Sequence, residues 1–142
     1  MDHLKAKGHQ HIRHIIAAPF IYLLIIPIVF FDMFISIYHA VCFPLYRIPK
    51  VKRSQYVKID RYKLPYLKWW QKINCAYCEY ANGLVHYAVR IGGDTEKYWC
   101  GIQHEKSKNF IPPEHQKDFI PYGDEEAYEK YEKQCLMQRD KS

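Results

Sequence analysis

Residues Ile15 to Pro44 read IIAAPFIYLLIIPIVFFDMFISIYHAVCFP, an apolar run that decides how the rest of the chain is arranged. The run is longer than the roughly 20 residues that a helix needs to cross a hydrocarbon core about 30 Å thick. It also exceeds the apolar part of a removable signal peptide, about 7 to 15 residues, and no small-x-small cleavage site follows it. The sequence therefore predicts a transmembrane segment over residues 15–46, kinked where Pro27 removes one backbone hydrogen bond.

The basic residues on the two sides of this segment predict its orientation. Residues 1–14 form a basic, histidine-rich flank with three lysine or arginine residues, whereas seven lie within residues 47–63. This excess favours a cytoplasmic C-terminal side. The alternative is an in-plane or re-entrant hairpin broken near Pro27, with both ends cytoplasmic. In either arrangement the cysteines that follow face a reducing compartment, where thiols or metal ligands are expected rather than disulfides.

Three polar residues within the apolar run share one helical stripe. Asp32, Ser36 and His39 follow one another at intervals of four and three residues. An aspartate near the bilayer centre costs about 2.5 to 3.5 kcal/mol, so it needs a partner. The stripe predicts either a proton, ion or metal contact or hydrogen bonds between helices. Both interpretations predict a homo-oligomer or a larger membrane complex.

Residues 47–73 form a basic, aromatic collar after the apolar run. Tyrosine and tryptophan rings are typical of the membrane interface, and a lysine or arginine near an anionic surface contributes about 1 kcal/mol. Membrane lipids are therefore the expected partners of this collar. The residues expected at the lipid interface are Arg47, Lys50, Lys52, Arg53, Trp69 and Trp70.

The positive charge of the chain belongs to its membrane-proximal half. The chain has 142 residues and a net charge of +6. Up to and including Cys75 there are 12 basic and 3 acidic residues, whereas 9 basic and 12 acidic residues follow. Basic and aromatic interleaving also occurs in proteins that bind single-stranded nucleic acids. Because the basic stretch adjoins a membrane segment, lipid headgroups are favoured and no nucleic-acid partner is expected.

Residues 74–106 contain a pattern typical of a metal site. Cys75-x2-Cys78 is followed after 21 residues by Cys100-x3-His104. Three thiolates and one imidazole make a tetrahedral set for zinc or for a single iron ion. The sequence therefore predicts a Cys3His metal-binding module.

This metal site depends on how the chain turns between its two halves. A tight turn at Asn82-Gly83 with short strands would bring the ligands together, whereas two helices turning at Gly92-Gly93 would keep Cys78 and Cys100 apart. Two other interpretations stay open. Neighbouring subunits could share the ligands, or the cysteines could fill a small core. In a helical arrangement two further stripes arise, Glu96, Cys100 and His104 on one segment and Cys78, Asn82 and His86 on the other.

Residues 107–142 form a tail of two parts. Three prolines within residues 107–123 predict an extended strap, and Asp124 is expected to cap a charged helix with acidic residues in its first turn. The apolar stripe of this helix is thin, so the helix is expected to dock on a partner. The chain contains no nucleophile-elbow, phosphate-loop or dinucleotide motif, so catalysis is not the favoured interpretation.

Several segments together resemble a group of small uncharacterised bacterial inner-membrane proteins. The resemblance rests on PFIY, IYH, CFPLY, VKRSQY, INCAYCEYANG and WCGIQH, and it covers most of residues 14–105. It implies a bacterial inner membrane and carries no activity.

The expected fold is mainly α-helical: one kinked transmembrane helix, an interfacial segment, a small cytoplasmic Cys/His module with a helical or short β-hairpin form, and a C-terminal helix. The expected function is that of a membrane-anchored structural or accessory subunit of a homo-oligomer or larger complex, carrying the Cys3His module. The alternatives are a membrane-bound redox or metal-dependent enzyme and a monotopic protein that modifies lipid headgroups.

Overall fold

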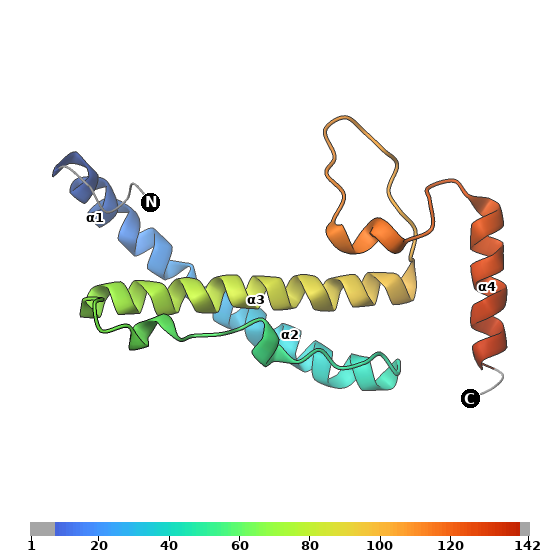
Figure 1. Cartoon of the computed structure of the whole chain (residues 1–142), viewed down its shortest axis with the longest axis horizontal. Coiled ribbons are helices and arrows are strands. Elements are labelled where there is room, and N and C mark those ends of the chain that lie inside the picture. Colours follow the sequence, from blue (N-terminus) through green and yellow to red (C-terminus); the bar gives the residue numbers. More distant parts are fainter. Residues whose placement is uncertain (1–7, 140–142) are drawn as a thin grey trace. The chain divides into compact units, whose positions relative to one another are not determined.

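The computed structural model describes residues 8–139, with residues 1–7 and 140–142 outside the described part. The side chains of residues 8–11, 14 and 135–139 also lie outside it. The chain is mainly helical, as expected, and divides within one long helix into two compact units, Met1–Ala88 and Val89–Ser142. The helices are α1 (Gly8–Leu23), α2 (Ile25–Leu45), α3 (Trp69–Trp99) and α4 (Glu125–Arg139), with short 3-10 helices at Arg53–Gln55, Arg61–Lys63 and Glu114–Asp118 (Figure 1).

α1 and α2 together contain the apolar run. By length and composition Ile15–Leu45 could cross a membrane, the one such stretch in the described part of the chain. α1 ends at Leu23, whose carbonyl would have accepted the N–H that Pro27 lacks. Leu24, between the two helices, keeps helical φ and ψ angles of −63° and −17°. The helical hydrogen bonding is thus interrupted near Pro27, and a sharp kink there stays a prediction.

Residues 46–68, here called the return segment, lie between α2 and α3 and run back along α2. The Val51 N–H donates to His39 of α2, and two residues later Arg53 pairs with Asp32. Higher residue numbers in the return segment therefore meet lower residue numbers in α2. Because the segment is antiparallel to α2, its basic residues lie beside the apolar helix rather than beyond its end.

α3 is a single helix of 31 residues, so of the two forms considered for this region the structure has the helical one and not the short β-hairpin. The turns considered at Asn82-Gly83 and Gly92-Gly93 lie inside this helix. Gln71 Oε1 accepts the Lys68 N–H at 2.9 Å at the start of α3, half of a capping box. The helix ends before Gly101, whose φ of 63° suits glycine. Residues 8–139 form no strand, only an isolated parallel bridge between Ile102 and Ile120.

Position 83 of α3 requires a glycine, because the return segment passes directly against the helix there. A Cβ added there would lie 2.8 Å from the Tyr56 carbonyl oxygen and 2.9 Å from the Cα of the next residue. Beside this contact, Leu84 and Tyr87 of α3 and Phe43 of α2 are buried. The core of the first unit therefore lies where α2, the return segment and α3 meet.

The second unit contains the end of α3, a loop, the 3-10 helix Glu114–Asp118 and α4. The 3-10 helix interrupts the strap that was expected over residues 107–123. At the start of α4 the Asp124 Oδ1 accepts the Ala127 N–H at 3.0 Å, so the predicted cap is confirmed.

Candidate functional site

Asp32 of α2 is the centre of a polar network in the first unit. Both Arg53 terminal nitrogens contact its carboxylate, with Nη2 and Oδ2 2.7 Å apart, which makes a bidentate pair. Ser36 donates to Oδ1 at 3.2 Å, and the Tyr80 hydroxyl of α3 donates to Oδ2 at 2.7 Å. The Asp32 side chain is 15% exposed and that of Arg53 39%. These four residues, here called the Asp32 network, join α2, the return segment and α3.

The protonation states of this network are fixed near neutral pH. The hydrogen bond with Asp32 raises the pKa of Arg53, so the guanidinium stays charged. Burial, helped by the hydrogen bond to Asp32, raises the pKa of Tyr80, so its hydroxyl stays a neutral donor. The arrangement therefore suits a structural role, holding the return segment and α3 on α2, better than a proton relay.

His39 holds the return segment one level farther along α2. The ring is 8% exposed, and its Nε2 accepts the Val51 N–H at 3.0 Å, so Nε2 carries no proton. Its Nδ1 lies 3.1 Å from the Tyr87 hydroxyl, which places the ring proton on Nδ1 by the hydrogen-bond pattern. Burial raises the pKa of Tyr87. Protein groups thus occupy both ring nitrogens, as they occupy both carboxylate oxygens of Asp32.

The partners Tyr80 and Tyr87 were missed in the sequence, although a pattern could have indicated them. Asp32 and His39 are seven residues apart, and so are Tyr80 and Tyr87. Two helices that run in the same direction and contact along one stripe can match residues at this spacing, which is close to two turns. The match indicates that α2 and α3 run parallel in the first unit, as their contacts show.

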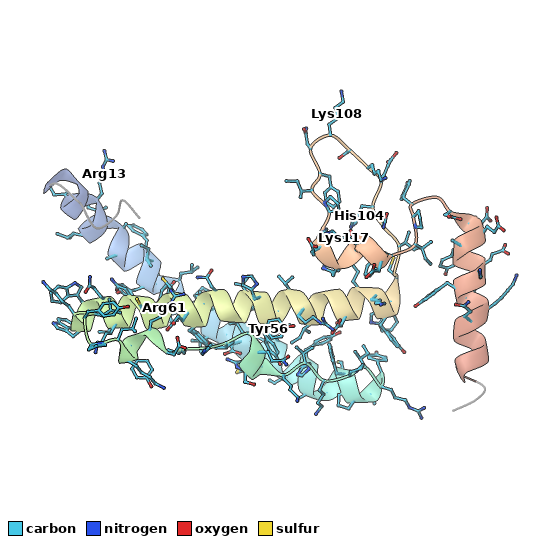
Figure 2. The ribbon with its side chains drawn as sticks, in the orientation of Figure 1. Arg13, Tyr56, Arg61, His104, Lys108 and Lys117 are labelled. Carbon is cyan, nitrogen blue, oxygen red and sulfur yellow. The ribbon has the colours of Figure 1, made fainter. Side chains whose placement is uncertain are left out.

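A groove opens between the return segment and α3 on another side of the first unit. The return segment contributes Tyr56, Lys58, Asp60 and Arg61, two of which are labelled in Figure 2. α3 contributes Glu79 and also Cys78, Asn82 and His86, the stripe that a helical arrangement predicted. We call this the Glu79 groove, because Glu79 is its most buried charged side chain, 5% exposed.

The charges of the Glu79 groove are paired unequally. Arg61 contacts only Oε1 of Glu79, with its Nε and its backbone N–H each 3.3 Å away. Oε2 is buried and has no hydrogen-bond partner among the described residues. Lys58 lies 3.0 Å from Asp60, and its hydrogen bond lowers the pKa of that carboxyl. One buried carboxylate oxygen therefore remains available to a donor from outside the chain.

The four residues predicted to bind a metal are divided between the two units. Cys75 is half-buried and Cys78 exposed, both on α3 in the first unit. Cys100 and His104 are exposed in the second unit, where the His104 ring packs on Phe110. Within the described residues of either unit, no three Cys, His, Asp or Glu side chains gather as a metal site would require. A zinc or iron ion at these four residues stays a prediction.

The second unit has a polar cluster on the last turns of α3. Glu96 accepts from Gln116 Nε2 at 2.6 Å and lies 2.7 Å from His115 Nε2. The His115 ring lies against Gly93, where an added Cβ would be 2.9 Å from its Cγ. Glu96 thus holds the 3-10 helix Glu114–Asp118 onto α3, and it lies with these two residues rather than forming a site with Cys100.

The residues expected at the lipid interface differ in their surroundings. Arg47, Lys50 and Lys52 are exposed on the return segment, whereas Arg53 is half-buried against Asp32. At the start of α3 the rings of Trp69 and Trp70 are 71% and 45% exposed and meet edge to face, with centroids 5.8 Å apart. The side chains of His9, His11 and His14 in the histidine-rich N-terminal flank lie outside the described residues.

No family model matches this chain, and comparisons with curated proteins and with solved structures find no match either.

Proposed function

We propose that the protein is a membrane-bound accessory protein that lies along one leaflet and acts at the level of the lipid headgroups. The observation that carries this proposal is the contact between Arg53 and Asp32. It keeps the basic return segment beside the apolar helix that precedes it.

The path of the return segment argues against a helix standing upright through the bilayer. From the end of α2 at Leu45 back to Asp32 is 13 residues, or about 20 Å of helix. In an upright helix the exposed lysines of the return segment would enter a hydrocarbon core only about 30 Å thick. Each charge near the centre costs about 2.5 to 3.5 kcal/mol, so this placement is unfavourable.

An in-plane placement removes this conflict. α1 and α2 expose a broad face without charge, on which Phe30, Phe34, Ile37 and Val41 are each more than half exposed. An interfacial helix buries such a face in the acyl region and keeps its polar neighbours in the headgroup layer. The return segment, with Lys50 and Lys52, would then lie among the headgroups. This favours the in-plane alternative over a single upright span.

Location and partners complete the proposal. The basic return segment favours the cytoplasmic face of the membrane, and the resemblance to small bacterial inner-membrane proteins implies that this is a bacterial inner membrane. The exposed rings of Tyr128 and Tyr131 on α4 support docking on a second copy or on a larger membrane complex. The spacing of Cys75, Cys78, Cys100 and His104 supports a zinc or iron ion as a further part of the proposal, which elemental analysis of the purified protein tests.

Topology reporters at the two ends of the full chain test the in-plane placement. A phosphatase-type reporter, active only outside the cytoplasm, is fused to either end, and a cytoplasmic reporter is fused in parallel. We expect the cytoplasmic reporter to be active at both ends. Reporters of opposite type active at the two ends would contradict the proposal and restore the single span.

A further inference from the structure

The Glu79 groove has an anionic floor and a cationic rim. The Glu79 side chain is 5% exposed, whereas those of Lys58 and Arg61 are 78% and 62% exposed. Two carboxylates, Glu79 and Asp60, balance the two cations, so the groove is neutral overall while its charges are separated by depth. A ligand that matches it has a cationic end that points inward and an anionic group that stays near the surface.

The unpartnered oxygen of Glu79 specifies the cationic end. Oε2 is buried without a hydrogen-bond partner in the described part of the chain, and a buried carboxylate oxygen requires a donor. A primary ammonium group has three N–H donors, whereas the quaternary ammonium of choline has none. Glu79 should therefore distinguish the two.

The rim of the Glu79 groove indicates which anionic group the ligand carries. Lys58 and Arg61 both belong to the return segment and both line the groove. Arginine and lysine are the side chains that commonly bind phosphate oxygens. Arg61 contacts Glu79 through Nε and its backbone N–H, and its side chain is 62% exposed, so it is accessible to a ligand at the rim.

We propose that the Glu79 groove binds the phosphoethanolamine headgroup of a phospholipid, with its ammonium group on Glu79 and its phosphate on Lys58 and Arg61. The choice of a lipid source rests on the proposed function, because the return segment then lies among headgroups. The headgroup chemistry rests on the groove alone, and free phosphoethanolamine shares it.

Calorimetric titration of the full chain in detergent tests this proposal. The probes are short-chain phosphatidylethanolamine, short-chain phosphatidylcholine with the same acyl chains, and free phosphoethanolamine. We expect the ethanolamine lipid to bind about tenfold or more tightly than the choline lipid, because a site built for hydrogen-bond donors rejects an analogue that lacks them. Equal affinities for the two lipids would overturn the proposal. Free phosphoethanolamine binding as tightly as the lipid would overturn the lipid source.

Matched variants locate the binding in the groove. Glu79→Gln keeps the shape of the side chain and should abolish the preference for ethanolamine over choline, whereas Glu105→Gln, an exposed residue outside the groove, should keep it. Lys58→Met, at a side chain 78% exposed, should fold as the wild type does and should weaken binding of both phosphoethanolamine forms. A preference that persists in Glu79→Gln would overturn the proposal.

Membrane placement is measured separately. Glu79→Gln should still float with vesicles that contain no ethanolamine lipid, because α1 and α2 supply that attachment. If Glu79→Gln loses the preference for ethanolamine over choline but still floats with the vesicles, the change affects binding in the groove and not membrane attachment. Reporters of opposite type at the two ends would overturn the proposed in-plane placement, but they would not overturn binding of phosphoethanolamine in the groove.

Discussion

Arg53 contacts three elements of the first unit through one side chain. It belongs to the return segment, it forms two hydrogen bonds with Asp32 of α2, and its Cζ lies 5.7 Å from the centre of the Tyr87 ring of α3. A lysine has the same charge but no planar fork, so it cannot make the bidentate contact. The bidentate contact with Asp32 therefore requires arginine at this position.

A double-mutant cycle measures this pair. Arg53→Met leaves the Asp32 carboxylate without its cation, and we expect the free energy of unfolding in detergent to fall by about 1 to 3 kcal/mol, less than for a fully buried pair because Arg53 is partly exposed. Adding Asp32→Asn should recover part of the loss. Lys52→Met, an exposed neighbour, is the control. Strictly additive single effects would show that the pair is not coupled.

Two glycines of α3 provide a second test at the residue scale. Gly83→Ala places a Cβ 2.8 Å from the Tyr56 carbonyl oxygen, so backbone must move, and we expect a loss of about 1 to 3 kcal/mol. Gly92→Ala meets no atom within 4 Å and should stabilise the helix by up to about 1 kcal/mol. Thermal unfolding followed by circular dichroism distinguishes them. Similar shifts for both variants would mean that the return segment does not pack on Gly83.

At the scale of elements, the sequence predicts best where composition alone determines the structure. The apolar run predicts a helix, and α1 and α2 occupy it, because only helical hydrogen bonding is compatible with such a long apolar stretch in lipid. The charged C-terminal helix and its Asp124 cap follow from local residue preferences in the same way.

Prediction from the sequence fails where one residue type can serve two purposes. Asn82-Gly83 is a common turn pair, yet both residues lie in a helix. Gly83 is a glycine because another segment passes close to the helix there. The contacting residues of that segment, Tyr56 and Val57, lie 27 and 26 residues earlier in the chain, so no local pattern indicates them. Arg53 suits a lipid phosphate or a carboxylate equally well, and only the folded chain shows that it pairs with Asp32. Glu79 belongs to no sequence motif, so the sequence alone does not indicate it.

The contact between α2 and α3 predicts a loss of stability at alkaline pH. The pKa of Tyr80 is raised in the folded chain above the ordinary value of about 10. Its stabilising contribution is complete below that value and is lost as the pH rises through the folded pKa, because the unfolded chain releases its proton first. We expect the free energy of unfolding to fall above about pH 10, and less steeply in Tyr80→Phe.

The control for this experiment is Tyr122→Phe, at an exposed residue of the second unit. Tyr80→Phe should also lose about 0.5 to 1.5 kcal/mol at neutral pH, since its hydroxyl no longer donates to Asp32. Identical alkaline slopes for the wild type and Tyr80→Phe would rule out this tyrosine as the titrating group.

At the scale of the whole molecule, the first unit combines an uncharged apolar face with a basic segment and exposed tryptophans. Such a combination is typical of proteins that lie in the interface rather than across the bilayer. The second unit contributes a polar cluster at Glu96 and a helix that begins at Glu125, and neither belongs to the apolar run. The proposed function therefore places the membrane contact in the first unit.

Tryptophan quenching by brominated lipids measures the depth of this unit. In a Trp99→Phe background only Trp69 and Trp70 report, and both rings are exposed at the start of α3. We expect lipids brominated near the headgroup to quench more strongly than lipids brominated near the bilayer centre, because tryptophan favours the interface. Stronger quenching from the centre would place α3 in the hydrocarbon.

The sequence separation of 21 residues between Asp32 and Arg53 also sets an order of events during synthesis. A loop of this length closes at modest entropic cost, so the ion pair can form once Arg53 has left the ribosome, while Tyr80 is still inside it. The aspartate is then neutralised while the nascent apolar helix first meets lipid. A nascent chain with Arg53 outside the ribosome and Tyr80 still inside it would already be prepared for insertion.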